Sequence, residues 1–309
     1  MTKAGSRAVR FDRYGDRSVL YVADVPIPAP GPGEVVVEVK AAAINPGEAA
    51  IRRGALADRF PATFPSGEGS DLAGIVSAVG DGVGEFAVGD SVLGVSFRRS
   101  SQATYVSVPI SQLIHKPPEL SWEVAGSLYV VGCTAFAAVR AVDPKRGETI
   151  AVSAAAGGVG TVVVQLLGLH GSHVLGIASE INAQWLRAHG AVPVSYGDGL
   201  AERLRSAGSN IDAFIDLFGP EYVELAVELG IPRDRIETIA SFEKAQELGV
   251  KAEGSATAST PEVLTEMANL VASGAVEIPI AATYPLDRVA DAYAELEQRH
   301  TRGKIVLIP

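Results

Sequence analysis

A turn rich in small residues is the clearest chemical signal in this sequence. Gly157, Gly158 and Gly160 lie between an apolar run at residues 149–153 and a helical pattern at 161–170. Glycines let the backbone approach an anion, and a helix start offers unpaired N–H groups and the positive end of the helix dipole. The spacing therefore predicts a pyrophosphate site for a dinucleotide. Packing of a strand against a helix would also explain these small residues.

The elements around this turn alternate between strand and helix. Apolar runs at 173–178, 192–195 and 211–217 are separated by helical patterns, and an earlier helix is expected over 122–142. This alternation predicts a parallel, doubly wound sheet.

The residues from 19 to 118 have a different pattern. Short β-branched runs, such as 34–39 and 74–79, are separated by proline and glycine turns and predict a compact β domain. The tail predicts helices over 261–273 and 286–297 and a closing strand at 304–308. Periodicity alone leaves open which domain that strand completes.

Composition limits the possible partners. The chain has 309 residues, of which 47% are hydrophobic and 20% are charged, so two domains are expected. A net charge of −10 argues against nucleic acid or an anionic membrane as the main partner. The single cysteine, Cys133, excludes an internal disulfide and a thiolate-rich metal cluster. Because no stretch resembles a signal peptide or a membrane span, we expect a cytoplasmic protein.

Short motifs recur in a family-specific order along nearly the whole chain. They are PGPGE at 30–34, AINP at 43–46, GEGSDLAG at 67–74, VGD at 88–90, AAGGVG at 155–160 and RGKIVL at 302–307. Together they resemble the medium-chain dehydrogenase/reductase superfamily, specifically its zinc-free quinone oxidoreductase branch.

This resemblance implies an α/β fold with two domains and an active site in the cleft between them. A GroES-like, β-rich catalytic domain would comprise residues 1–120 and, after the chain returns, 259–309. A Rossmann domain over 121–258 would bind NADP(H). The resemblance also implies hydride transfer, and a homodimer built through an edge of the Rossmann sheet.

Zinc is not expected. Matching the alcohol dehydrogenase motifs residue by residue places Asn45, Ser70 and Val130 at the three catalytic zinc positions, and these are not a plausible ligand set. Cys133 lies beyond the third position and is interpreted as a small buried residue.

The end of the second Rossmann strand decides between the two nicotinamide cofactors. NAD-preferring folds carry an acidic residue there, whereas this chain has Ser179, which favours NADP(H). Glu180, the next residue, is acidic and argues for NAD(H) instead. Asn182 replaces the lysine expected near the 2′-phosphate, so Arg187 or another arginine would have to supply the positive charge. Tyr196 matches a family tyrosine.

Thr134 and Lys304 match family residues at the cofactor, whereas Phe218, Ser241 and Phe242 stand at the carboxyl ends of predicted strands, where ligands collect in open α/β sheets. Thr134 and Lys304 each also have an explanation that involves no cofactor. Thr134 would be a hydroxyl bonded within its own helix, and Lys304 would be an exposed charge before a strand. The predicted cofactor-binding residues are Asn45, Thr134, Ala156, Gly157, Gly158, Val159, Gly160, Ser179, Asn182, Tyr196, Phe218, Ser241, Phe242 and Lys304.

Asn45 and Glu48 are the predicted catalytic residues. Asn45 would place an amide near cofactor or substrate, unless it only caps the turn before Pro46. Glu48 would orient the cofactor or relay a proton, unless it pairs with Arg52 at helical spacing. Family tyrosines are replaced by Ala50 and Leu56, so solvent is the expected proton source.

The expected substrate is a quinone or a similar conjugated carbonyl. Reduction of an alkenal or enone double bond, and a non-catalytic NADP(H)-binding redox sensor, are the alternatives.

Overall fold

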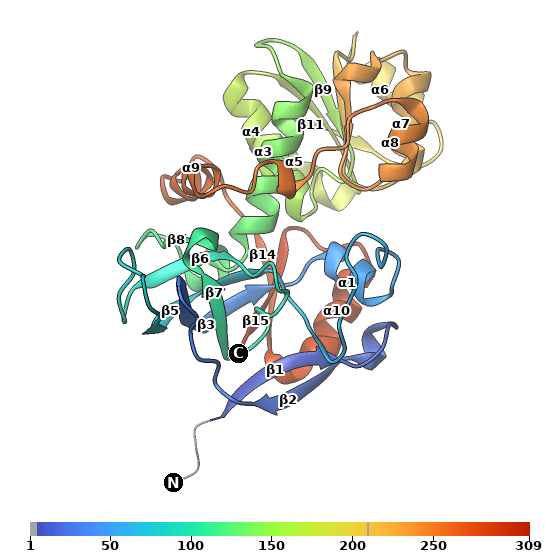
Figure 1. Cartoon of the computed structure of the whole chain (residues 1–309). Helices are drawn as coiled ribbons and strands as arrows, with labels where there is room; N and C mark the ends of the chain where they lie inside the picture. The colour runs from blue at the N-terminus through green and yellow to red at the C-terminus, as the bar shows by residue number, and fades with distance from the viewer. Residues whose placement is uncertain (1–4, 209) are drawn as a thin grey trace. The chain divides into compact units, whose positions relative to one another are not determined.

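The β-branched runs near the N-terminus pair mainly as antiparallel strands in the computed structural model, which describes residues 5–208 and 210–309 (Figure 1). The chain divides into two units. The first runs to Val130 and adds Thr260–Ala272 and Ile280–Pro309; the second comprises Val131–Ser259 and Ser273–Pro279.

The first unit contains two sheets and four helices among the described residues. A three-stranded sheet has the order β2-β1-β4, and a seven-stranded sheet has the order β14-β15-β3-β5-β6-β8, with β7 also paired to β3. The strands are β1 (Ser6–Phe11), β2 (Tyr21–Val25), β3 (Glu34–Ala43), β4 (Ser66–Gly67), β5 (Asp71–Val79), β6 (Ser91–Val95), β7 (Tyr105–Pro109), β8 (Leu113–His115), β14 (Ile280–Pro285) and β15 (Lys304–Ile308). The helices are α1 (Pro46–Arg52), α2 (Trp122–Ala125), α9 (Pro261–Ala272) and α10 (Val289–Glu297).

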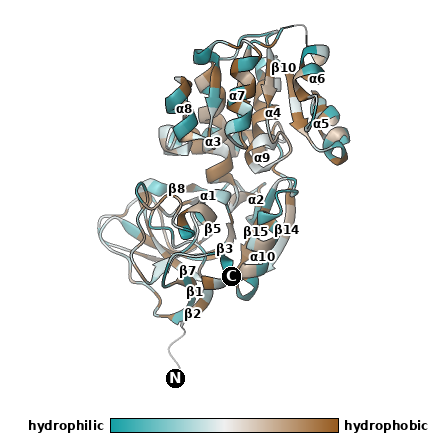
Figure 2. Ribbon diagram, turned by 90° about the vertical axis from the view of Figure 1, so that its right-hand side faces the viewer, coloured by the Kyte–Doolittle hydropathy of each residue, from teal (hydrophilic) through white to brown (hydrophobic). Residues whose placement is uncertain are grey.

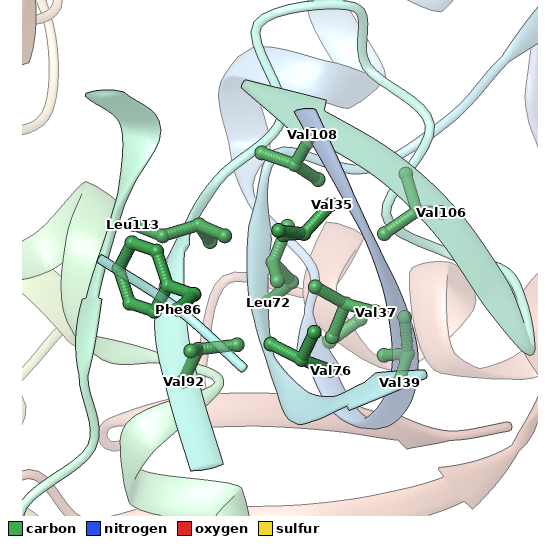
Figure 3. Packing of buried hydrophobic residues seen from close by; sticks show 11 residues of the cluster. Val35, Val37, Val39, Leu72, Val76, Phe86, Val92, Val106, Val108 and Leu113 are labelled. Atoms are coloured by element: carbon green, nitrogen blue, oxygen red, sulfur yellow. The ribbon is translucent and has the colours of Figure 1, made fainter. Parts of the chain in front are cut away.

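Residues two apart on β3 build much of this unit's core. Val35, Val37 and Val39 lie on one face of the strand and pack with Leu72 and Val76 of β5 (Figure 3). The closing strand β15 pairs with β3 and β14, so it completes the first unit.

The second unit is a parallel five-stranded sheet in the order β11-β10-β9-β12-β13. This is the predicted doubly wound arrangement, and the order reverses beside β9. Its strands are β9 (Thr149–Val152), β10 (His173–Ala178), β11 (Ala191–Ser195), β12 (Ala213–Asp216) and β13 (Ile236–Thr238). Its helices are α4 (Gly158–His170), α5 (Ala183–Ala188), α6 (Leu200–Ala207), α7 (Pro220–Glu228) and α8 (Phe242–Leu248), together with most of α3 (Leu128–Val142).

Most of α8 is hydrophilic (Figure 2), although Leu248 at its end packs against the hydrophobic core of the second unit. No helix of the described residues is both long and apolar enough to cross a lipid bilayer.

The single helix expected over 122–142 is wrong. The structure has α2 and α3, which are separated at Gly126 and Ser127. Gly126 lies so close to β3 that an added Cβ would stand 2.5 Å from the carbonyl oxygen of Ala41. Its own carbonyl accepts a hydrogen bond from Ala43 N–H at 2.9 Å. This contact between distant segments overrides the helical pattern.

Candidate functional site

The glycine turn joins β9 to α4 in the second unit. The helix begins at Gly158, and within the described residues no side chain caps it at Gly157. A Cβ on Gly160 would stand 2.1 Å from the carbonyl oxygen of Ala154, so only glycine fits there. The turn therefore presents backbone N–H groups at a helix start, which suits an anion, and close packing against the turn itself accounts for glycine at position 160.

A buried carboxylate ties together the strand ends beside this turn. Asp216, at the end of β12, accepts hydrogen bonds from Ser153 Oγ at 2.7 Å and from Thr238 Oγ1 at 2.7 Å. It also accepts the backbone N–H groups of Phe218 and Gly219 at 2.9 and 3.2 Å. Burial raises the pKa of Asp216, against the effect of these donors. The carboxyl ends of β9, β12 and β13 are thereby held together.

Two kinds of side chain next to this carboxylate are open to a ligand, namely an unpartnered hydroxyl and two partly exposed aromatic rings. Ser241 is only 6% exposed, and its Oγ has no hydrogen-bond partner among the described residues. An orphaned buried hydroxyl is costly unless a ligand or water pairs with it. Phe218 and Phe242 stay 39% and 36% exposed, so two aromatic rings are accessible at the same sheet edge.

Polar groups also mark the ends of β10 and β11, which pair so that Ala178 lies opposite Ser195. Ser195 Oγ donates to Glu180 Oε2 at 3.1 Å, and Asn182 Nδ2 donates to Ser179 Oγ at 3.0 Å.

The charge beside these polar groups is mixed. Arg203 donates to the carbonyl oxygens of Ser195, Gly197 and Asp198 at 3.0, 3.0 and 2.7 Å, which places a cation under the loop that carries the exposed Tyr196. An anchored carboxylate at Glu180 and an anchored guanidinium at Arg203 therefore belong to the same region of the second unit.

In the first unit, Asn45 and Glu48 form one buried cluster. Glu48 is 4% exposed and accepts hydrogen bonds from Asn45 N at 3.0 Å and from Ser70 N at 2.8 Å. Tyr293 Oη donates to it at 3.0 Å, and Gln102 Nε2 donates at 3.4 Å. The carboxylate of Glu48 is thus an anchor that joins α1 to the start of β5 and to α10.

Arg52 does not pair with Glu48. Its guanidinium is fully buried and donates to Glu68 at 2.8 Å and to Glu297 at 3.5 Å. Its carbon Cζ also lies 4.3 Å from the centre of the Tyr293 ring. Burial, and then the charge of Glu48, raise the pKa of Glu68 to about 8, although Arg52 opposes both effects.

Lys304 joins the same cluster from the start of β15. The ammonium group donates to Asn45 Oδ1 at 2.5 Å, to the carbonyl oxygen of Ile44 at 3.3 Å and to Asp71 Oδ2 at 3.4 Å. It is 4% exposed, and Asp71 is fully buried. Burial raises the pKa of Asp71 to about 6, although the charge of Lys304 opposes this effect.

The three positions that would hold zinc in alcohol dehydrogenases are bound to these carboxylates instead. Ser70 N–H donates to Glu48, and Val130 N–H donates to Asp71 Oδ1 at 2.7 Å. Asn45 Nδ2 donates to both carboxylates. In the described part of the chain, no group of three or more His, Cys, Asp or Glu side chains is placed to hold a metal ion.

Two family models match this chain. An alcohol dehydrogenase GroES-like domain matches residues 31–146, and a model described as zinc-binding dehydrogenase matches residues 189–307. The quinone oxidoreductase of Pseudomonas aeruginosa is 30% identical over an alignment of 331 positions, gaps included. The alignment covers 98% of this chain and 100% of that protein. This chain belongs to the quinone oxidoreductase branch of the medium-chain dehydrogenase/reductase superfamily.

Solved structures of quinone oxidoreductases have the same fold. The enzyme from Coxiella burnetii has a TM-score of 0.89 at 28% identity, and each chain is covered to 99%. The Escherichia coli enzyme, whose structure is a complex with NADPH, has a TM-score of 0.88 at 27% identity and covers 98% of this chain and 100% of its own. The predicted combination of a GroES-like and a Rossmann-like domain is confirmed.

In this chain, the predicted site residues form separate groups. Asn45, Glu48 and Lys304 are in contact in the first unit. Thr134 is a buried residue of α3. The residues around the carboxyl edge of the second unit's sheet are Ala156, Gly157, Gly158, Val159, Gly160, Ser179, Asn182, Tyr196, Phe218, Ser241 and Phe242.

Sequence reasoning missed Asp71, Ser153, Asp216 and Thr238. One signal was available, since Asp71 and Asp216 each stand beside or within an apolar run that predicts a buried strand. A carboxylate at such a place requires several hydrogen-bond donors.

Proposed function

We propose that this quinone oxidoreductase relative is a zinc-free, NADPH-dependent oxidoreductase that acts on a quinone or a similar conjugated carbonyl. The observation that carries the proposal is the full-length similarity to quinone oxidoreductases, one of which was solved with NADPH. When bound, the nicotinamide cofactor supplies a hydride to the carbonyl compound.

The second unit would bind the cofactor. Gly157, Gly158 and Gly160 would receive the pyrophosphate, since no side chain caps the helix start and its first N–H groups have no partner within the helix. Ser241 would use its unpartnered hydroxyl to hold a polar group of the cofactor. Phe218, Phe242, Thr134, Ala156 and Val159 would complete the lining.

Ser179, Asn182 and Tyr196 would lie at the ribose end. NADP(H) is the proposed cofactor, because the expected acidic residue is displaced by one position from Ser179 to Glu180. Arg203 supplies the positive charge that the family lysine would have given, although its guanidinium is anchored to backbone carbonyls.

Asn45 and Glu48 would act in the first unit. Glu48 accepts several donors at once and so orients Asn45 rather than moving a proton. Ala50 and Leu56 carry no hydroxyl, so the reduced oxygen would take its proton from solvent. Enone or alkenal double-bond reduction is the second enzymatic reading, since the same hydride serves it. Homodimerisation and a cytoplasmic location remain predictions from the sequence.

Stopped-flow oxidation of NADPH with a naphthoquinone, a benzoquinone and an alkenal tests this proposal. Turnover with the quinones supports it, and turnover with the alkenal alone favours the double-bond reductase. Tight NADPH binding without oxidation by any acceptor would instead favour the redox sensor. Activity that depends on added zinc would refute the zinc-free mechanism.

A further inference from the structure

The hydrogen-bond partners of Asn45 determine which way its amide faces. An ammonium group only donates hydrogen bonds, and an ionised carboxylate only accepts them. Lys304 Nζ lies 2.5 Å from Asn45 Oδ1, whereas Glu48 Oε1 and Asp71 Oδ2 lie 3.1 and 3.0 Å from Asn45 Nδ2. The reverse amide orientation would place like partners against one another at all three contacts.

This arrangement uses most of the amide's hydrogen-bonding capacity. Asn45 Nδ2 has two hydrogens, and two carboxylates face it. Asn45 Oδ1 has two lone pairs, of which Lys304 occupies one. Among the described residues, the one hydrogen-bonding position of Asn45 that keeps no partner is therefore the second lone pair of its amide oxygen.

The ammonium group of Lys304 also uses its hydrogens within this cluster. Its three acceptors are Ile44 O, Asn45 Oδ1 and Asp71 Oδ2, which match the three hydrogens of an ammonium group. A direct bond from Lys304 to the cofactor would require the loss of one of these contacts. Asp71 in turn accepts Val130 N–H, so the cluster links α1, β5, β15 and α3.

We propose that Lys304 and Asp71 are positioning residues that hold Asn45 as a hydrogen-bond acceptor. Held in this way, Asn45 recognises an N–H or O–H donor, such as the carboxamide of the nicotinamide or the hydroxyl of a hydroquinone product. It does not donate to the carbonyl oxygen of the substrate. The effect on catalysis rests on the proposed function. The hold of Lys304 and Asp71 on the Asn45 amide, which we call the clamp, does not.

A double-mutant cycle between Lys304→Met and Asn45→Ala tests the proposal. If Lys304 acts through Asn45, each single variant lowers kcat with a quinone by about 10- to 100-fold, and the double variant is no slower than Asn45→Ala. Effects that multiply in the double variant would overturn the proposal, because Lys304 would then act independently. Lys145→Met, at an exposed lysine outside the cluster, is the matched control and should leave kcat and KM unchanged.

The role of Lys304 is separated from phosphate binding by fluorescence titration. The clamp predicts that Lys304→Met weakens NADPH and NADH binding by the same factor. Selective loss of NADPH binding would overturn it, since Lys304 would then contact the 2′-phosphate.

Two further measurements keep the test decisive. Because Lys304→Met leaves Asp71 buried without its cation, the pair Lys304→Met with Asp71→Asn repeats the cycle without a buried unpaired charge. If none of the acceptors tested leads the wild-type protein to oxidise NADPH, the proposed function fails. The double-mutant cycle is then measured on the midpoints of urea unfolding. Non-additive midpoints still support the clamp, and additive midpoints refute it.

Discussion

Glu237 makes the stability of the second unit depend on pH. This side chain of β13 is fully buried, Oε1 accepts Glu253 N–H at 2.6 Å, and Oε2 has no partner among the described residues. Burial raises the pKa of Glu237 from 4.5 to about 8, and the nearby charge of Glu253 acts in the same direction. Glutamine has nearly the same shape and no charge, so Glu237→Gln isolates the effect of ionisation.

The sign follows from proton uptake in the two states. Between pH 4.5 and about 8 the folded protein holds a proton on Glu237 that the unfolded chain has lost. The free energy of unfolding therefore falls as the pH rises through this range. The two pKa values differ by about 3.5, and each unit is worth ~1.4 kcal/mol, so the loss approaches about 5 kcal/mol as an upper limit.

Tryptophan fluorescence can measure this effect in the second unit alone. The chain has two tryptophans, and Trp122 belongs to the first unit whereas Trp185 belongs to the second. In a Trp122→Phe background, urea unfolding followed through Trp185 gives the stability at about pH 5 and about pH 9. Relative to the parent, Glu237→Gln should be more stable by a few kcal/mol at the higher pH, and the difference should shrink at the lower pH.

A matched control distinguishes burial from a general change in net charge. Glu243→Gln removes the same charge from an exposed position on α8 and should leave the pH dependence unchanged. Parallel pH profiles for the parent and Glu237→Gln would refute the reasoning, because Glu237 would then ionise alike in the folded and unfolded states.

Three other variants test the glycine turn, the proposed ribose end near Glu180 and the buried cluster around Glu48. Gly160→Ala should lower the unfolding free energy by about 1–3 kcal/mol and abolish NADPH binding in a fluorescence titration. Gly168→Ala on the same helix, where an added Cβ meets nothing within 4 Å, should be tolerated. Glu180→Gln should raise the affinity for NADPH relative to NADH about fivefold, since a like charge near the 2′-phosphate is removed; an unchanged ratio would place Glu180 away from the phosphate. Tyr293→Phe removes a donor to Glu48 and should cost about 1–3 kcal/mol in urea unfolding followed through Trp122, and an unchanged midpoint would contradict that role.

Local patterns predicted the elements whose formation depends on neighbouring residues. Strands β10 and β15 begin and end where the apolar runs at 173–178 and 304–308 place them. The glycine turn was recognisable because strand, small residues and helix start are adjacent in the chain. The break between α2 and α3 was not, because its cause is the approach of Gly126 to Ala41.

The candidate site divides in the same way. The sequence by itself determined the family, and it predicted a dinucleotide turn and site roles for Asn45, Glu48 and Lys304. Only the tertiary structure decided what these side chains contact. Asp71 is 26 residues from Asn45 and 233 residues from Lys304, and Ser153 is 63 residues from Asp216. Hydrogen bonds over such separations depend on strand order and register, which local periodicity does not encode, and so the buried partners emerge only when the sheets assemble.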